Sequence, residues 1–171
     1  GDFFPKEQKR KALENIKKLA VEELRCKVVV KLHPTEREEK NKDGLFEEVF
    51  GTESYDKNWR YSLEHPFLLG KNSIFAVSFY SGVAVDMIAL GIPTIQVIHP
   101  KPHDKTGAIM DYIKMGLVLG AGDYEELKNQ ALNIVNNNDS SAGILKKNYA
   151  EYFGVSTGSV GIITDDICGV L

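Results

Sequence analysis

The chain has 171 residues, of which 43% are hydrophobic and 26% charged, and its formal net charge is -3. This length suits one domain with a buried core, and we expect a single domain over residues 1–171. The charge pattern has no basic block of the kind that nucleic-acid binding requires, and no apolar run reaches the roughly 18 residues of a membrane span.

The first half of the chain alternates predicted helices and strands. Residues 6–24 repeat apolar side chains at helical spacing with charged residues between them, so we expect an amphipathic helix. The β-branched run at 27–32 predicts a buried strand, and the polar stretch 35–44 predicts a loop. We expect a short helix at 45–51 and a weaker strand at 59–62.

The middle of the chain holds the two clearest elements. After one or two helical turns at 64–70, the apolar run 73–79 predicts a strand. Residues 81–91 predict a helix, with Ser81 as its N-cap and Gly91 as its C-terminal stop.

The remaining elements continue the alternation. We expect strands at 93–98 and 117–120, and helices at 108–116, 123–137 and about 140–152. Asp123 is the expected N-cap of its helix, with Glu126 at the third helical position. The apolar segment 157–171 predicts a docked helix.

Strands that alternate with helices indicate an α/β fold with an open parallel sheet and helices on both faces, of Rossmann-like type. The chain opens on a helix, although such sheets usually begin with a strand. Either the helix begins the domain or a strand before it is missing from this sequence. Because residue 1 is a glycine and not an initiator methionine, we expect the chain to be a piece of a longer protein.

Polar side chains follow three of the predicted strands. His33 comes directly after the first strand, and His99 comes directly after the fourth. The third strand has Ser78 near its end, and Ser81 and Gly82 come after it. Parallel strands end at the same edge of a sheet, and ligands of open α/β sheets bind beyond that edge. The sequence therefore predicts one binding site at this edge.

The start of the helix at 81–91 suits a phosphate group, because its N–H groups are unpaired and Gly82 permits close approach. Ser81 either donates to the phosphate or serves only as a cap. Asp86 lies in an otherwise apolar helix, where it either binds sugar hydroxyls or is half-exposed or paired with a lysine. His33 either donates to a phosphate or is structural.

The sequence does not indicate a metal site or a cofactor. His99, His103 and Asp104 match no zinc-binding spacing and have no cysteine nearby. Cys26 and Cys168 lie far apart, which predicts free buried thiols and fits a cytosolic protein. No Walker loop, full dinucleotide fingerprint or nucleophile elbow is present.

The segments "VVVKLHP" and "SFYSGVAVDMIALGIPTIQV" resemble the C-terminal, nucleotide-sugar-binding half of GT-B glycosyltransferases. The likeness is greatest to bacterial surface-polysaccharide enzymes, the capsule and lipo-oligosaccharide sialyl-, Kdo- and glycerophosphotransferases. It implies that His33 contacts the donor phosphate, that Ser81 and Gly82 hold it, and that Asp86 binds ribose or sugar. Ser78 and Ser81 are separated by two residues, where the family has an adjacent pair.

The resemblance implies polysaccharide biosynthesis with a CMP-, CDP- or UDP-linked sugar as donor and no cofactor. A saccharide or lipid-linked acceptor would bind an N-terminal half that also supplies the catalytic base, so catalytic residues stay unassigned here. The protein would be cytoplasmic, with a peripheral position at the inner face of the membrane as one option. Two alternatives remain: an epimerase similar to UDP-N-acetylglucosamine 2-epimerase, and a non-catalytic α/β ligand-binding module.

Overall fold

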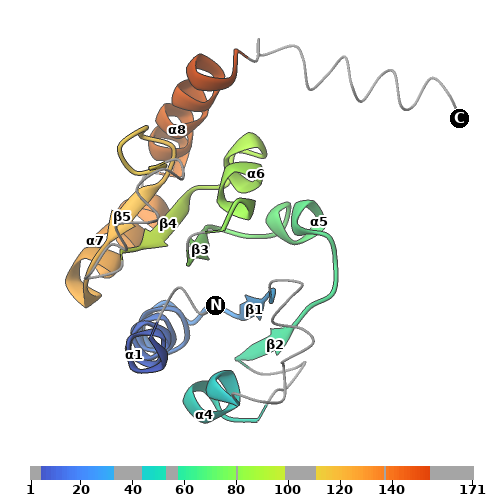
Figure 1. The fold of residues 1–171 in the computed structure, drawn as a ribbon, viewed down its shortest axis with the longest axis vertical. Coiled ribbons are helices and arrows are strands. Elements are labelled where there is room, and N and C mark those ends of the chain that lie inside the picture. The colour runs from blue at the N-terminus through green and yellow to red at the C-terminus, as the bar shows by residue number, and fades with distance from the viewer. Residues whose placement is uncertain are drawn as a thin grey trace, which may run out of the picture.

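The protein is an α/β structure with two small open parallel sheets and helices packed against them (Figure 1). The computed structural model describes residues 5–32, 44–52, 58–79, 81–98, 111–136 and 138–154. Among its helices, none is both long and apolar enough to cross a membrane.

The smaller sheet pairs β1 (Val28–Val30) with β2 (Trp59–Tyr61) in parallel. Helix α4 (Leu45–Phe50) is held against β2 by aromatic contacts. The ring of Phe50 lies 5.6 Å from that of Trp59, and the Trp59 indole donates a hydrogen bond to the carbonyl of Gly51 at 3.1 Å. Trp59 is therefore buried although a two-stranded sheet alone buries little.

The larger sheet contains β3 (Ala76–Ser78), β4 (Thr94–Val97) and β5 (Leu119–Ala121), all parallel and in that order. Helix α6 (Val83–Ala89) connects β3 to β4 and packs on both strands. Helix α7 (Tyr124–Asn136) follows β5 and packs on β4 and β5.

Both faces of the central strand β4 are covered. Ile95 is fully buried in an apolar cluster that includes residues of α7. Thr94 and Gln96 point to the opposite face because side chains alternate along a strand, and both are buried as well. Helix α6 also contacts β4, and we place it on the face of Thr94 and Gln96, opposite α7. This is the arrangement expected of a parallel sheet.

Helix α1 (Lys6–Ile16) continues as a π-helical segment, η1 (Lys17–Glu23), and together they join the two sheets. Figure 1 shows α1 between α4 and α7, and it contacts both. The main core is shared by these helices and the larger sheet. Its buried members are Leu13, Ile16, Leu19, Leu45, Val49, Ile95, Ala121, Leu127, Ala131 and Ile134.

Two further helices, one short and one of 16 residues, complete the described fold. Helix α5 (Pro66–Gly70) packs on α6, and α8 (Asn138–Phe153) packs on α6 and α7. The approach of α5 to α6 depends on Gly70, where an added Cβ would lie 2.9 Å from the sulfur of Met87. A second apolar cluster lies between α6, α8 and the segment before β5.

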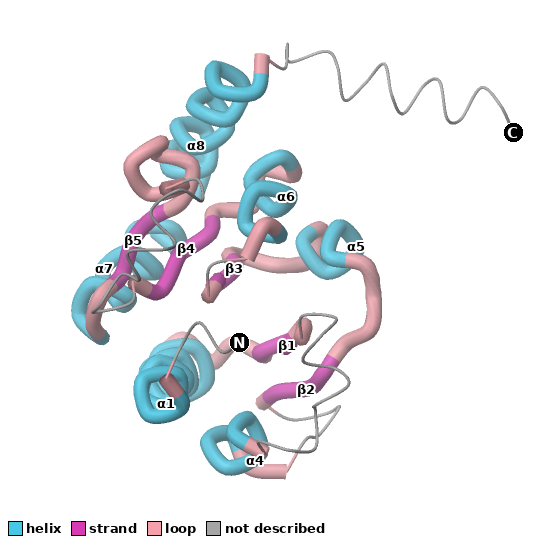
Figure 2. Tube along the Cα trace, viewed as in Figure 1, coloured by secondary structure: helices cyan, strands magenta, loops and turns pink. Residues whose placement is uncertain are grey.

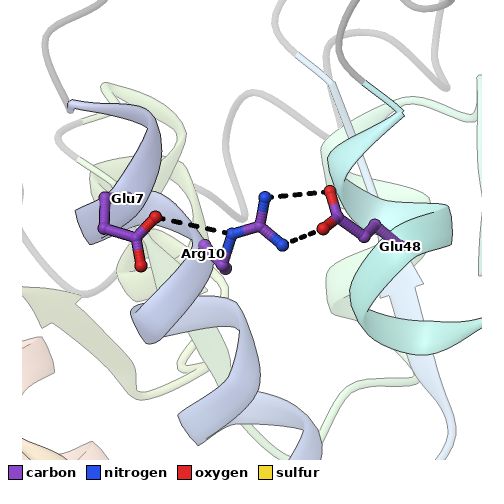
Figure 3. A network of polar contacts seen from close by, with 3 residues as sticks. All are labelled: Glu7, Arg10 and Glu48. Atoms are coloured by element: carbon purple, nitrogen blue, oxygen red, sulfur yellow. Dashed lines mark hydrogen bonds and ion pairs between the residues drawn. The ribbon is translucent and has the colours of Figure 1, made fainter.

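A charged contact ties α4 to α1. The Arg10 guanidinium bonds both carboxylate oxygens of Glu48 and lies 3.7 Å from the carboxylate of Glu7 (Figure 3). Hydrogen bonding to Arg10 lowers the pKa of Glu48 and raises that of Arg10. The contact is bidentate, which fixes the relative orientation of the two helices as well as their distance.

A second polar cluster ties η1 to α7. The Tyr124 hydroxyl donates to the Glu23 carboxylate, and Lys128 Nζ lies 2.8 Å from the same carboxylate. Lys18 Nζ lies 3.9 Å from the centre of the Tyr124 ring, in a cation–π contact. Burial and the hydrogen bond to Glu23 raise the pKa of Tyr124 from 10.0 to about 12.

We expect Tyr124 to ionise only at strongly alkaline pH. Because its pKa is raised in the folded state, the stabilisation it gives is complete below pH 10.0 and is lost as pH rises towards about 12. Ultraviolet titration of the wild type and of Tyr124→Phe gives the Tyr124 transition as a difference. In Glu23→Gln this transition should move towards lower pH. An ordinary tyrosine transition in the wild type would contradict the prediction.

The structure confirms the predicted alternation of elements, and every predicted strand has a counterpart in β1 to β5. The prediction of one sheet is wrong for the described residues, which form two sheets. The helix expected at 108–116 is also wrong in its described part, because residues 112–116 form turns. There the Asp111 side chain accepts from the Lys114 N–H at 3.2 Å, and Gly116 adopts a φ of 65°. The Asp111 side chain takes an N–H that a helix would use, and the left-handed conformation of Gly116 ends any helical turn there.

Other predictions lie outside the described residues. These are the loop at 35–43, the docked helix at 157–171 and the thiol of Cys168. Cys26 is described, and it is a free, half-buried thiol.

The predicted N-cap of α7 is confirmed. The Asp123 carboxylate accepts from the Glu126 N–H at 2.9 Å. The Glu126 carboxylate in turn accepts a hydrogen bond from the Gly122 N–H at 2.7 Å, whereas in a standard capping box the donor is the N–H of the N-cap residue itself.

Replacing Asp123 with alanine should lower the free energy of unfolding by about 1 kcal/mol, because the N–H of Glu126 loses its acceptor. Urea denaturation followed by circular dichroism measures the change. Asp123→Asn keeps an acceptor oxygen and should stay within about 0.5 kcal/mol of the wild type. Equal losses in the two variants would mean that the cap is not the source of the stability.

Candidate functional site

The loop between β3 and α6 forms the centre of the candidate site. Ser78 ends β3, and its hydroxyl accepts a hydrogen bond from the Ser81 N–H at 3.2 Å. The Ser81 hydroxyl accepts from the Val83 N–H at 3.4 Å. The predicted capping role of Ser81 is thus present, one residue before the N-cap position, which Gly82 occupies. Two serine hydroxyls are thereby brought to the carboxyl end of β3.

Both hydroxyls retain donor capacity. A serine oxygen that accepts one hydrogen bond still carries a hydrogen that it can donate. Ser78 is buried and Ser81 half-buried, so their positions are defined by packing as well as by the loop. The pair therefore presents hydroxyl hydrogens at the start of α6.

Gly82 leaves the approach to the helix open. It is exposed, and a Cβ added to it would meet no atom within 4 Å. Its φ of -57° is accessible to any residue. Its N–H donates to no acceptor among the described residues, whereas the N–H of Val83 is bonded to Ser81. Gly82 therefore offers a backbone donor and space in front of it, and its identity is not required by the backbone conformation.

Asp86 lies in the first turn of α6 and is half-buried. The sequence left three roles open for it: sugar binding, partial exposure, or an ion pair with a lysine. In the described part of the chain no ion pair includes its carboxylate. The position of Asp86 therefore fits two of the three roles, a half-exposed carboxylate or a carboxylate that binds a ligand.

Gln96 is the site residue that the sequence reasoning missed. It lies in β4 directly opposite Ser78 in the parallel register and is 3% exposed. Its side-chain oxygen is buried, and no described group donates to it. The sequence did give one indication of it, because a glutamine is unusual in the otherwise mainly apolar strand predicted at 93–98. A buried amide with an unused acceptor is costly unless a donor reaches it, so Gln96 is a candidate for contact with whatever lies beside Ser78.

The structure brings some of the predicted residues together. Ser78, Ser81, Gly82 and Asp86 lie along one strand–loop–helix connection, with Gln96 beside Ser78. His33 and His99 lie outside the described residues, so their part in the site stays a prediction. His65, which the sequence did not assign to any site, caps α5 through a bond from the Phe67 N–H at 3.4 Å.

This arrangement can hold an anion. Two hydroxyls, one backbone N–H and the positive end of a short helix all favour a negatively charged group. Asp86, one turn farther along α6, would repel a phosphate placed against it but would accept hydrogen bonds from sugar hydroxyls. A ligand with a phosphate at one end and hydroxyls at the other fits both features.

Comparisons with known proteins do not identify a family. The sequence matches no protein-family model, and no curated protein matches it at a significant level. The assignment of function therefore depends on the residues and their arrangement.

Proposed function

We propose that this chain is the donor-binding domain of a glycosyltransferase that uses a nucleotide sugar, with polysaccharide synthesis as its setting. One observation supports it most strongly: Ser78, Ser81 and Gly82 form a phosphate-compatible loop, and a carboxylate follows one turn later at Asp86. A nucleotide sugar carries both phosphate and hydroxyl groups. The likeness of the two sequence segments to GT-B enzymes supports the same choice.

In this proposal the domain stabilises charge on the leaving nucleotide. When the glycosidic bond breaks, negative charge grows on the phosphate oxygens. The hydroxyls of Ser78 and Ser81 and the N–H of Gly82 are donors already held in place, so little reorganisation is needed. His33 adds an imidazole donor, His99 contacts the nucleotide, and Asp86 orients the sugar or ribose hydroxyls. The acceptor and the catalytic base belong to another part of the enzyme.

Titration calorimetry with CMP, CDP, UDP and UDP-N-acetylglucosamine tests the proposal. We expect one nucleotide series to bind selectively. Asp86→Asn and His33→Ala should each weaken binding about tenfold, since each removes a hydrogen bond that involves a charged partner. The base of the preferred nucleotide would identify the donor class.

Glu151→Gln is a suitable control, because Glu151 lies on the exposed side of α8 and pairs only weakly with Lys147 at 3.9 Å. Its affinity should equal that of the wild type. If no nucleotide binds to the folded chain, or if binding ignores Asp86 and His33, the proposal is wrong. Release of inorganic phosphate or free sugar need not be measured, since the readout is binding alone.

A further inference from the structure

Three residues form a row across the larger sheet, near the carboxyl ends of its strands. Figure 2 shows β3, β4 and β5 side by side, with α6 next to β3 and β4. In the parallel register Ser78 of β3 lies opposite Gln96 of β4, and Gln96 lies opposite Gly120 of β5. Residues that pair in this way direct their side chains to the same face of a sheet. Ser78 and Gln96 are therefore neighbouring side chains on the face where we place α6.

The β5 side of Gln96 is apolar. Gly120 has no side chain, and the space above it is taken by two isoleucines. A Cβ added to Gly120 would lie 3.0 Å from Cδ1 of Ile98 and 3.2 Å from Cδ1 of Ile113. A polar partner for the Gln96 amide therefore has to come from the other side, where Ser78 lies.

The Gln96 side-chain oxygen is a buried acceptor, and no donor among the described residues bonds to it. An acceptor in this state is unfavourable in the free protein, and the penalty disappears when a donor reaches it. Because no described hydrogen bond holds the oxygen, the side chain can turn towards Ser78 about its single bonds without breaking one. Gln96 is thus prepared to accept a hydrogen bond from a ligand.

Ser78 offers the opposite kind of group. Its oxygen accepts from the Ser81 N–H at 3.2 Å, and its hydrogen is left to donate. Neighbouring strands are about 4.8 Å apart, so adjacent groups of one ligand can reach both Ser78 and Gln96. A phosphate that is ionised at neutral pH has acceptor oxygens only, so it can use Ser78 but cannot donate to Gln96. A ligand that satisfies both residues carries a phosphate and a donor group next to it.

From this pairing we infer that Gln96 selects nucleotide-linked donors that have an O–H or N–H on the carbon next to the one that bears the phosphate. The phosphate accepts from Ser78, and the neighbouring group donates to the Gln96 oxygen. UDP-hexoses and CDP-glycerol have such a group. Sialic acid and Kdo do not, because their phosphate-bearing carbon lies between a carboxylate and a methylene group. This choice rests on the proposed function and narrows its substrate class.

Titration calorimetry of the 171-residue chain with matched pairs of ligands tests the selection. UDP-glucose is compared with UDP-2-deoxyglucose, and CDP-glycerol with the analogue that lacks its middle hydroxyl. In whichever series binds, we expect the ligand with the hydroxyl to bind about tenfold more tightly, since its analogue leaves the buried oxygen of Gln96 without a donor. CMP-N-acetylneuraminic acid is the third probe, because it has no such hydroxyl.

The variant Gln96→Met removes the acceptor and keeps an unbranched side chain of similar length. In this variant the two ligands of a pair should bind within about twofold of each other, because the difference between them comes from Gln96. Its urea midpoint should equal or exceed that of the wild type, since no described hydrogen bond to the oxygen is lost.

Thr94→Val is the matched control. Thr94 is buried on the same face of β4, two residues before Gln96, and its hydroxyl donates to the carbonyl of Ile92 at 3.5 Å. The substitution removes a buried polar group from this face but not the acceptor beside Ser78. The variant should therefore keep the roughly tenfold preference for the ligand with the hydroxyl.

The possible failures are distinguishable. Equal affinity of the wild type for both ligands of a pair, or a preference that survives in Gln96→Met, would overturn the role of Gln96. Selective binding of CMP-N-acetylneuraminic acid would keep the proposed function and overturn the choice of donor class. Binding of none of the nucleotides would overturn the proposed function and this choice together. If Gln96→Met does not fold, the paired ligands still decide on the wild type.

Discussion

Replacing Ile95 with alanine is expected to lower the free energy of unfolding by about 3 to 4 kcal/mol. Ile95 is 0% exposed and lies at the centre of β4, within the cluster shared by α1, α4 and α7. The change removes buried methyl and methylene groups and leaves a cavity that three helices and a sheet cannot all collapse to fill. Since domains of this size are stable by only about 5–15 kcal/mol, the loss is a large share of the total.

Chemical denaturation followed by tryptophan fluorescence measures this loss, because Trp59 lies in the other sheet and reports whether both sheets unfold together. Ile144→Ala is the matched control. Ile144 is 62% exposed on α8, so the same change of side chain should alter stability by about 0.5 kcal/mol or less. Similar losses at the two positions would contradict the assignment of Ile95 to the core.

Replacing Gly82 with aspartate is expected to weaken nucleotide binding by about 100-fold, the largest functional effect we predict. The substitution is compatible with the fold, since Gly82 has an ordinary φ and open space around its Cα. Aspartate at the N-cap of a helix also favours the helix, so stability should stay the same or rise. Loss of binding without loss of stability would locate the phosphate at this position.

Gly82→Asn separates charge from bulk, because asparagine has nearly the same volume as aspartate and no charge. We expect it to weaken binding by less than about tenfold. The difference between the two variants should shrink as salt concentration rises, as repulsion between partly exposed charges does. If both variants bind as well as the wild type, no phosphate lies beside Gly82.

Local features of the fold were predictable from the sequence because they depend on neighbouring residues. The β-branched run that forms β1 and the apolar run that forms β3 each predict a strand by composition. Asp123 caps α7 where a carboxylate three residues before a glutamate predicts it. The position of Ser78 and Ser81 between a strand and a helix followed from the same local pattern.

The lateral arrangement of strands was not predictable in this way. Periodicity shows that a segment is a strand, but not which strand lies beside it, since that depends on contacts between distant segments. The division into two sheets therefore differs from the prediction. Gln96 was missed for a related reason: its importance comes from lying opposite Ser78, and this pairing depends on register rather than on sequence neighbours.

The π-helical winding of η1 places residues on the same side of the helix that a regular α-helix would place on different sides. In a regular α-helix, Leu24 would lie about 140° around the axis from Leu19. Here the N–H of Leu24 donates to the carbonyl of Leu19 at 2.8 Å, so the wider turn brings it back above Leu19. Leu24 then packs against the same core as Leu13 and Leu19. The wider turn thus extends the apolar stripe of the helix by one more residue, which a helical wheel drawn at about 100° per residue would not reveal.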